Sequence, residues 1–164
     1  MTGAKRVVLS LLTVILVAAT ATGFGLWRWA AGHERALPQI SAFSDGQLVL
    51  VGPYRYCDVR LSHCTVPGSV GQLNLTARHP VQLSVPDVIG RAPWVLLRAY
   101  EDSPKAVVTE FKPNSRLAVT IPAVDAQHGR LTGIAVQVPT LVRDSNGNEF
   151  PLPHAEWSVK TNWD

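Results

Sequence analysis

The sequence lacks the short motifs by which many catalytic and nucleotide-binding sites are recognised. The glycine-rich dinucleotide and phosphate loops, Gly-x-Ser-x-Gly and His-Glu-x-x-His are all absent. The five histidines are scattered without the paired spacing of a metal site. Serine, histidine and aspartate are present, but no spacing selects a catalytic triad, which is defined by geometry. The sequence therefore predicts no enzymatic activity, no catalytic residue and no cofactor.

An excess of basic charge is also absent from most of the chain. The net charge of +3 arises before residue 37, where Lys5, Arg6, Arg28 and Arg35 outnumber Glu34. The remaining sequence contains eleven basic and eleven acidic residues and is neutral. Nucleic-acid-binding proteins carry a basic surface, so no nucleic-acid partner is expected.

The longest stretch without a charged residue runs from Val7 to Trp27, between Lys5-Arg6 and Arg28. A helix of that length spans roughly 31 Å, the thickness of the hydrocarbon core of a bilayer. The sequence therefore predicts a cytoplasmic N-terminus over residues 1–6, a transmembrane helix over 7–27 in contact with the lipid bilayer, and a juxtamembrane linker over 28–46.

A secretory signal peptide is the alternative interpretation of this segment, because Ala19-Thr20-Ala21 fits a cleavage site. The apolar run continues through Leu26 and Trp27, which favours an uncleaved anchor. Lys5 and Arg6, close to the membrane, favour an N-terminus inside the cell. We expect a single-pass protein of the cell membrane with its C-terminal domain outside the cytoplasm, or a secreted domain if cleavage occurs near Ala21.

The only cysteines are Cys57 and Cys64. An even number of cysteines outside the cytoplasm predicts a disulfide, here closing a short local loop. A metal site that also uses His63 and His79 is the alternative. The spacing of the cysteines is wider than in most zinc sites, so the disulfide is the preferred interpretation.

After Gly46, apolar and polar residues alternate with a period of two, which indicates strands with one buried face. Prolines and other turn formers separate these runs and leave no room for a long amphipathic helix. The residues predicted to face inward are Leu48, Leu50, Leu73, Leu75, Val81, Leu83, Val85, Leu117, Val119, Ile121, Ile134, Val136, Val138, Ala155, Trp157, Val159 and Thr161.

The number and spacing of these runs predict an all-β domain over residues 47–164, an immunoglobulin-like β-sandwich. A small β-barrel is the alternative. Asn146-Gly147 is the strongest hairpin signal. The run from Trp94 to Leu97 is apolar without alternation, which is typical of a strand that is covered on both faces or central in its sheet. Residues 162–164 are expected to be poorly tied down.

Residues 93–100 (PWVLLRAY), 120–142 and 147–161 resemble an actinobacterial family that is well represented in mycobacteria and catalogued only as a domain of unknown function. The resemblance implies a single membrane helix followed by a modest domain in the cell envelope. It assigns no catalytic residue.

Three polar or aromatic residues are candidates for an interaction. Arg98 lies in the most apolar strand, where it either faces outward over apolar surface or anchors a ligand or an internal charge. His154 follows Pro151-Leu152-Pro153 and is expected to open the last strand, in a structural or edge role. Trp163, near the C-terminus, is expected to contact a partner or to cover the end of the sandwich.

The preferred function is a non-catalytic, membrane-tethered module that binds or scaffolds another envelope protein. A carrier or sensor of an apolar ligand would instead need a cavity between the sheets. An enzyme with an unrecognised site would need a deep cleft that gathers Arg98, His154 and a carboxylate. The sequence does not identify the partner.

Overall fold

The computed structural model describes residues 2–31 and 37–163, which belong to two separate units. The first unit contains a single helix, α1 (Thr2–Ala31), which includes the uncharged segment from Val7 to Trp27. Among the residues that the structure describes, no helix is both long and apolar enough to cross a membrane. The second unit, Leu37–Asp164, is a β-domain.

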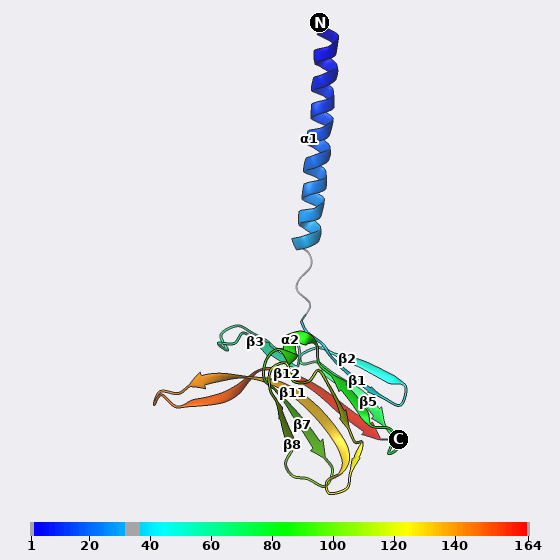
Figure 1. Cartoon of the computed structure of the whole chain (residues 1–164), viewed down its shortest axis with the longest axis vertical. Coiled ribbons are helices and arrows are strands. Elements are labelled where there is room, and N and C mark those ends of the chain that lie inside the picture. The colour runs from blue at the N-terminus through cyan, green and yellow to red at the C-terminus, as the bar shows by residue number, and fades with distance from the viewer. Residues whose placement is uncertain (1, 32–36, 164) are drawn as a thin grey trace. The chain divides into compact units, whose positions relative to one another are not determined.

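The β-domain consists of two open sheets (Figure 1), which confirms the predicted sandwich and not the barrel. The small sheet has the order β2 (Gln47–Val51), β1 (Ile40–Ser44), β6 (Val81–Ser84) and β9 (Ala118–Ile121). The large sheet has the order β4 (Cys64–Thr65), β3 (Arg55–Cys57), β12 (Glu149–Trp163), β11 (Gly129–Arg143), β7 (Trp94–Tyr100) and β8 (Val107–Phe111), with β5 (Val70–Leu75) on β12 and β10 (Val124–Asp125) on β11.

The strands β11 and β12 form the centre of the large sheet and are joined by the predicted hairpin at Asn146-Gly147. Gly147 has φ +87°, a conformation that side chains disfavour, so glycine suits this turn. Strand β5 runs parallel to the second half of β12, whereas the other paired strands are antiparallel.

Side chains from the inner faces of both sheets form one hydrophobic core. Its largest members are Trp94 and Trp157, each at most 1 % exposed. The predicted alternation is confirmed in β5, β6, β11 and β12. The fully buried side chains include Ile40, Leu73, Leu75, Val81, Leu83, Leu96, Ile121, Leu131, Val136 and Val159.

The predicted register of β2 is wrong. Leu48 and Leu50 are 60 % and 63 % exposed, whereas Val51 is buried. Both faces of this strand are apolar, so the pattern alone could not select the inner one. Close packing against Gly71 on β5 selects the face of β2 that contains Val51 as the inner one. A Cβ atom at Gly71 would lie 2.4 Å from Cγ2 of Val51. The absent side chain leaves room for Val51 against β5.

Two further segments differ from the sequence analysis. Strand β1 lies within the predicted linker over 28–46, and its Ile40 and Ala42 are completely buried, so the β-domain begins earlier than residue 47. After Pro86, one of the prolines that separate the predicted strands, the chain forms a single helical turn, α2 (Asp87–Gly90), which buries Ile89. Four residues are too few for any apolar periodicity to reveal this turn.

Candidate functional site

The strand β7 has apolar side chains on both faces, as its sequence indicates. Trp94 and Leu96 point into the core and are each 1 % exposed. Val95 and Leu97 point to the opposite side of the large sheet, which we call the outer face. The inner face shares the hydrophobic core with residues of the small sheet, whereas Val95 and Leu97 are half-buried on the outer face.

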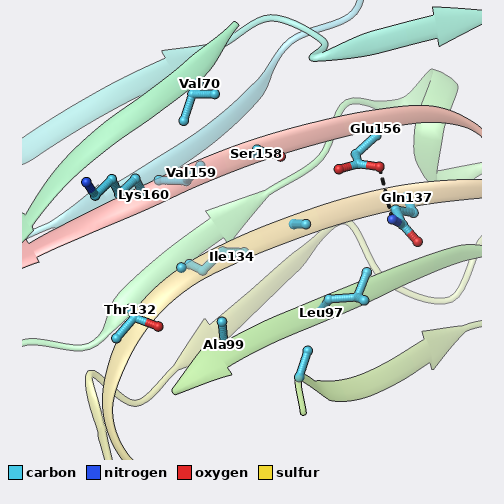
Figure 2. Close-up of a pocket in the computed structure, with 13 residues that line it drawn as sticks. Val70, Leu97, Ala99, Thr132, Ile134, Gln137, Glu156, Ser158, Val159 and Lys160 are labelled. Carbon is cyan, nitrogen blue, oxygen red and sulfur yellow. Dashed lines mark hydrogen bonds between the residues drawn. The ribbon is translucent and has the colours of Figure 1, made fainter. Parts of the chain in front are cut away.

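A shallow hollow of about 420 Å³ lies on the outer face across β7, β11 and β12 (Figure 2). Strand register places Leu97 beside Ala135, Ala135 beside Ser158 and Ser158 beside Val70. In the next row, Ala99 pairs with Gly133 and Gly133 with Lys160. We call this hollow the outer trough; its floor and walls are Val70, Leu97, Ala99, Gly133, Ala135 and Ser158.

The depth of the outer trough follows from the small size of the side chains at its centre. Ala135 and Ser158 occupy positions where a larger side chain would fill the hollow. Gly133 has little room for a side chain, because a Cβ atom there would lie 3.4 Å from the carbonyl oxygen of Val159 on β12. Small residues on the central strands between Leu97 and Val70 therefore shape a concave surface.

Opposite charges lie at the two ends of the outer trough. Glu156 and Lys160 both project from the outer face of β12, four residues and thus about 13 Å apart along the strand. The Nε2–H of Gln137 donates a hydrogen bond of 3.1 Å to a carboxylate oxygen of Glu156 (Figure 2). The surface between the charges is mainly apolar, so the outer trough is an apolar hollow with one charge of each sign at its ends.

Arg98 lies on the inner face of β7, so of the two alternatives for this residue the outward-facing one is wrong. It pairs across the sheet with Ile134 and Val107. One Nη–H group donates a hydrogen bond of 2.9 Å to Oγ1 of Thr109, but the buried Nε has no hydrogen-bond partner among the described residues. No described carboxylate forms an ion pair with Arg98.

Tyr100 continues the same face of β7 two residues further on. Its side chain is 4 % exposed in total, and its hydroxyl group is buried next to the side chain of Arg98. Burial raises the pKa of Tyr100, an effect that the nearby positive charge of Arg98 partly offsets and the charge of Asp125 reinforces. The ring stacks on His128 with a centroid distance of 5.7 Å.

His154 occupies the middle of β12 rather than its start. Val138 pairs with Ala155 and Pro139 with Pro153, so His154 is the extra residue of a β-bulge. Its Nδ1–H donates a hydrogen bond of 3.0 Å to the carbonyl oxygen of Cys57, because a carbonyl group can only accept. His154 also lines a hollow of about 230 Å³ beside Pro38 and Trp157.

Trp163 is a half-buried part of β12. Its indole N–H donates a hydrogen bond of 2.9 Å to the carbonyl oxygen of Leu131, and the guanidinium of Arg130 lies 5.2 Å from its ring centroid. These contacts support the interpretation that Trp163 covers an end of the sandwich. They also contradict the expectation that the terminal residues are poorly tied down, since Asn162 and Trp163 both pair with β5.

The predicted disulfide between Cys57 and Cys64 is confirmed. Within its loop, the carboxylate of Asp58 accepts hydrogen bonds from the hydroxyl group of Ser62, from Nδ1 of His63 and from two backbone N–H groups. Mainly the bond from Ser62, followed by that from His63, holds the pKa of Asp58 well below its usual range. In the described part of the chain, no group of side chains has the arrangement of a metal site.

The candidate residues do not form one site. Arg98 pairs with Ile134, and Ile134 pairs with Val159, so Arg98 lies level with Val159 in the sheet. His154 lies five residues from Val159 along β12. That separation corresponds to about 17 Å in a strand. The deep polar cleft required by the enzyme hypothesis is therefore not built from Arg98 and His154.

With this geometry established, comparison with known proteins identifies the family. The profile described as "Protein of unknown function (DUF2771)" matches residues 33–162. The chain belongs to this family. It is 51 % identical over 148 residues to the uncharacterized proteins Rv0875c of Mycobacterium tuberculosis and Mb0899c of Mycobacterium bovis, covering 90 % of this chain and 91 % of each relative. No solved structure matches the chain.

Family membership confirms the resemblance seen in the sequence, and nothing in the family description indicates catalysis. The outer trough was not recognised from the sequence, although one signal for it was present. The apolar run from Trp94 to Leu97 indicates a strand that is covered on both faces or central in its sheet, and β7 does lie between β11 and β8, with Val95 and Leu97 half-buried on its outer face. An apolar strand face that is left partly exposed can mark an interaction site, and the sequence pattern does not distinguish it from a covered one.

Proposed function

We propose that this protein is a membrane-tethered binding module of the bacterial cell envelope whose outer trough receives a segment of another protein. The observation that carries the proposal is the apolar outer face of β7. Val95, Leu97 and the neighbouring Val108 would normally be polar on the free face of an antiparallel sheet. Val108 is 55 % exposed, so burial of this face against a partner would be favourable.

An amphipathic helix is the segment that fits the outer trough best. A peptide lying on the face of a sheet meets side chains rather than free backbone groups. An extended peptide buried there would leave its own N–H and C=O groups unpaired, whereas a helix satisfies them internally. The small floor at Ala135 and Ser158 permits close approach of a helix, as when a helix covers a sheet within a domain.

The charges at the ends of the trough give this helix a direction. Glu156 favours a basic residue of the partner and Lys160 an acidic one. A separation of about 13 Å corresponds to slightly more than two helical turns. The complementary helix therefore carries an apolar stripe with a basic residue near one end and an acidic residue about two turns away.

The two alternative functions receive less support from the structure. A carrier of an apolar ligand needs an internal cavity, but Trp94, Leu96 and Trp157 fill the space between the sheets. The enzyme alternative requires Arg98, His154 and a carboxylate in one cleft, but Arg98 on β7 lies level with Val159, five residues from His154 along β12. A binding module requires neither feature.

Site-specific photo-crosslinking in native membranes tests the proposal. A photoreactive residue at Leu97 is expected to capture one envelope protein through a helical segment, which mass spectrometry of the crosslinked peptide identifies. Ala135→Arg fills the trough and should abolish that crosslink. Thr120→Arg places the same side chain on the exposed outer face of the small sheet and should leave the crosslink unchanged.

Charge reversal provides the second arm of this experiment. Lys160→Glu should weaken the crosslink, and reversal of the acidic residue in the captured helix should restore it. The proposal fails if Ala135→Arg and Thr120→Arg capture the same protein equally well while both remain folded. Capture through an extended segment would retain the binding face but exclude the helix.

The membrane tether rests on the uncharged sequence of α1 and is tested separately. The only natural cysteines form a disulfide, so Asn146→Cys introduces a single free thiol in the exposed hairpin turn. A membrane-impermeant thiol reagent should label this residue in intact, wall-stripped cells. Labelling only after the membrane is broken would place the domain in the cytoplasm and overturn the proposed location.

A further inference from the structure

Strand β2 lies at an edge of the small sheet and, among the described strands, pairs only with β1 (Figure 1). A two-residue turn at Asp45-Gly46, with positive φ at both positions, joins the two strands and makes Ser44 and Gln47 a hydrogen-bonded pair. Hydrogen-bonded and non-hydrogen-bonded pairs alternate along an antiparallel ladder. The backbone N–H and C=O groups of Leu48 and Leu50 therefore point away from β1, to the free edge of β2.

The edge of β2 lacks the features by which natural sheets prevent edge-to-edge pairing. This strand contains no charged residue, no proline and no irregularity in its register with β1. The other described edges are protected. Strand β8 contains Glu110, β9 ends after four residues at Pro122, and the outer parts of β11 and β12 contain three prolines. On β5, the backbone N–H of Asn74 donates a hydrogen bond to the side chain of Gln47.

We infer that β2 pairs with β2 of a second copy of this chain, in antiparallel direction about a two-fold axis. Leu48 of one copy then lies opposite Leu50 of the other, and each such pair exchanges both of its N–H···O=C bonds. Val49 lies at the axis, opposite Val49 of the second copy. The same surface is used on both copies, so the arrangement is closed and leaves no β2 edge free to extend the sheet.

The side chains of β2 favour the same arrangement. Leu48 and Leu50 are exposed on the outer face of the small sheet, where Leu48 pairs with the exposed Phe43 of β1. Polar residues are usual on the free face of an antiparallel sheet. In the inferred pairing, each leucine lies beside a leucine of the second copy, and its removal from water is favourable. Because β2 carries no charge, nothing in the strand repels its own copy.

The size of this contact predicts a reversible dimer. Stable protein interfaces bury about 1,200–2,000 Å² in total. Pairing of two strands of five residues buries less surface than that. We therefore expect a dimer that dissociates on dilution. An extended segment of a different protein is the alternative occupant of this edge, but the match of β2 to itself favours a second copy.

Sedimentation equilibrium of the whole chain in density-matched detergent micelles tests the dimer over a range of protein concentrations. Leu48→Lys combined with Leu50→Lys places like charges opposite each other across the axis. Leu48→Lys combined with Leu50→Glu introduces as many charged residues but places each lysine opposite a glutamate of the second copy. The first variant should dimerise about tenfold more weakly than the second, because like charges directly opposite are unfavourable and opposite charges favourable.

A backbone variant tests the hydrogen bonds themselves. Leu50→Pro removes an N–H group that points to the free edge and retains the ladder between β2 and β1, as prolines on edge strands do. It should abolish the dimer. Leu50→Ala also loses the leucine side chain but keeps the N–H group, so it should weaken the dimer less. Far-ultraviolet circular dichroism identifies any variant that does not fold, and the charge variants then decide the question.

Oxidative crosslinking in native membranes tests the register. The natural cysteines are bonded to each other, so each variant has one free thiol. Two differently tagged chains, one with Leu48→Cys and one with Leu50→Cys, should become linked. Two chains with Thr120→Cys, on the exposed face of β9, should not.

Three results would overturn the inference. The first is a monomer at every concentration together with no crosslink between the tagged chains. The second is equal dimerisation of the two charge variants, which would place the contact elsewhere in the chain. The third is a crosslink from Leu48→Cys to a different protein in place of the second copy. None of these results bears on the outer trough, which lies on the large sheet.

Discussion

The indole Nε1–H of Trp157 donates a hydrogen bond of 2.8 Å to the carbonyl oxygen of Pro38, 119 positions earlier in the chain. This bond joins the last strand of the β-domain to the residue at which the chain enters it. The indole is completely buried, and the ring of Tyr56 packs against it edge-on at 6.2 Å. Trp157 therefore connects the beginning and the last strand of the β-domain within one core.

Replacement of Trp157 by alanine should unfold or nearly unfold the domain. Truncation of a buried tryptophan typically costs about 3–5 kcal/mol, a large part of the roughly 5–15 kcal/mol that stabilises a domain. Trp157→Phe retains most of the apolar volume but leaves the Pro38 carbonyl without its donor, so it should cost less. Urea denaturation of the variants measures both effects, and equal midpoints for wild type and Trp157→Ala would show that the strand is peripheral.

The disulfide between Cys57 and Cys64 should make a moderate and local contribution to stability. It closes a short loop, for which the chain-entropy model predicts a stabilisation of about 2 kcal/mol. Cys57→Ser combined with Cys64→Ser should lower the unfolding free energy by that amount without abolishing the fold. Intact-mass measurement should find no free thiol before reduction. Unfolding of the double variant in buffer would show that the bridge supports more than its own loop.

Period-two alternation predicted much of the sandwich because one face of most strands is clearly polar. In β12, Glu156, Ser158 and Lys160 oppose Trp157 and Val159, so only one register buries the apolar set. The cysteine pair was equally predictable, because only two cysteines exist and their loop is short. In these segments, local sequence and tertiary packing favour the same arrangement.

The remaining features depend on contacts between segments that are distant in sequence. Strand β2 is apolar on both faces, and its register is decided by close packing of Val51 against Gly71 on another sheet. The sequence left open whether Arg98 faces outward or anchors a ligand or an internal charge, and its position on the inner face follows from the register of Trp94 and Leu96. The outer trough is assembled from four strands, so no single segment could reveal its shape.

The carboxylate of Asp58 is expected to remain ionised in acid well below the usual range. Its lowered pKa arises first from the hydroxyl group of Ser62, then from His63. Because the folded-state pKa is depressed, the stabilisation that this carboxylate provides is present above its unfolded pKa and is lost as the pH falls through the folded value. Titration of the Asp58 carboxyl carbon by nuclear magnetic resonance measures this directly.

Ser62→Ala removes the largest cause of that shift and should raise the pKa of Asp58 toward its ordinary value. The remaining bonds from His63 and from the backbone N–H groups of Arg60 and Ser62 should keep it somewhat depressed. Thr65→Ala serves as the control, because its hydroxyl group bonds the Tyr56 carbonyl and not the carboxylate. An unchanged titration of Asp58 in Ser62→Ala would show that the hydroxyl group is not its main partner.

The C-terminal residues should contribute measurably to stability, contrary to the expectation from their position in the sequence. The carbonyl oxygen of Leu131 accepts hydrogen bonds from both the Thr161 hydroxyl and the Trp163 indole. Trp163→Ala removes the second donor and the ring beneath Arg130. Hydrogen bonds contribute about 1 kcal/mol and exposed cation–π contacts about 0.5–1 kcal/mol, so a total loss of about 2 kcal/mol is expected.

Deletion of residues 162–164 should destabilise the domain at least as much as Trp163→Ala, because it also removes the pairing of Asn162 with Asn74 on β5. Arg130→Gln separates the two contributions, since it abolishes the cation–π contact but retains the bond from the indole to Leu131. Its expected loss is therefore smaller than that of Trp163→Ala. If Trp163→Ala and the deletion both had the urea midpoint of the wild type, residues after Thr161 would contribute nothing to stability. Trp163 would then be available to contact a partner.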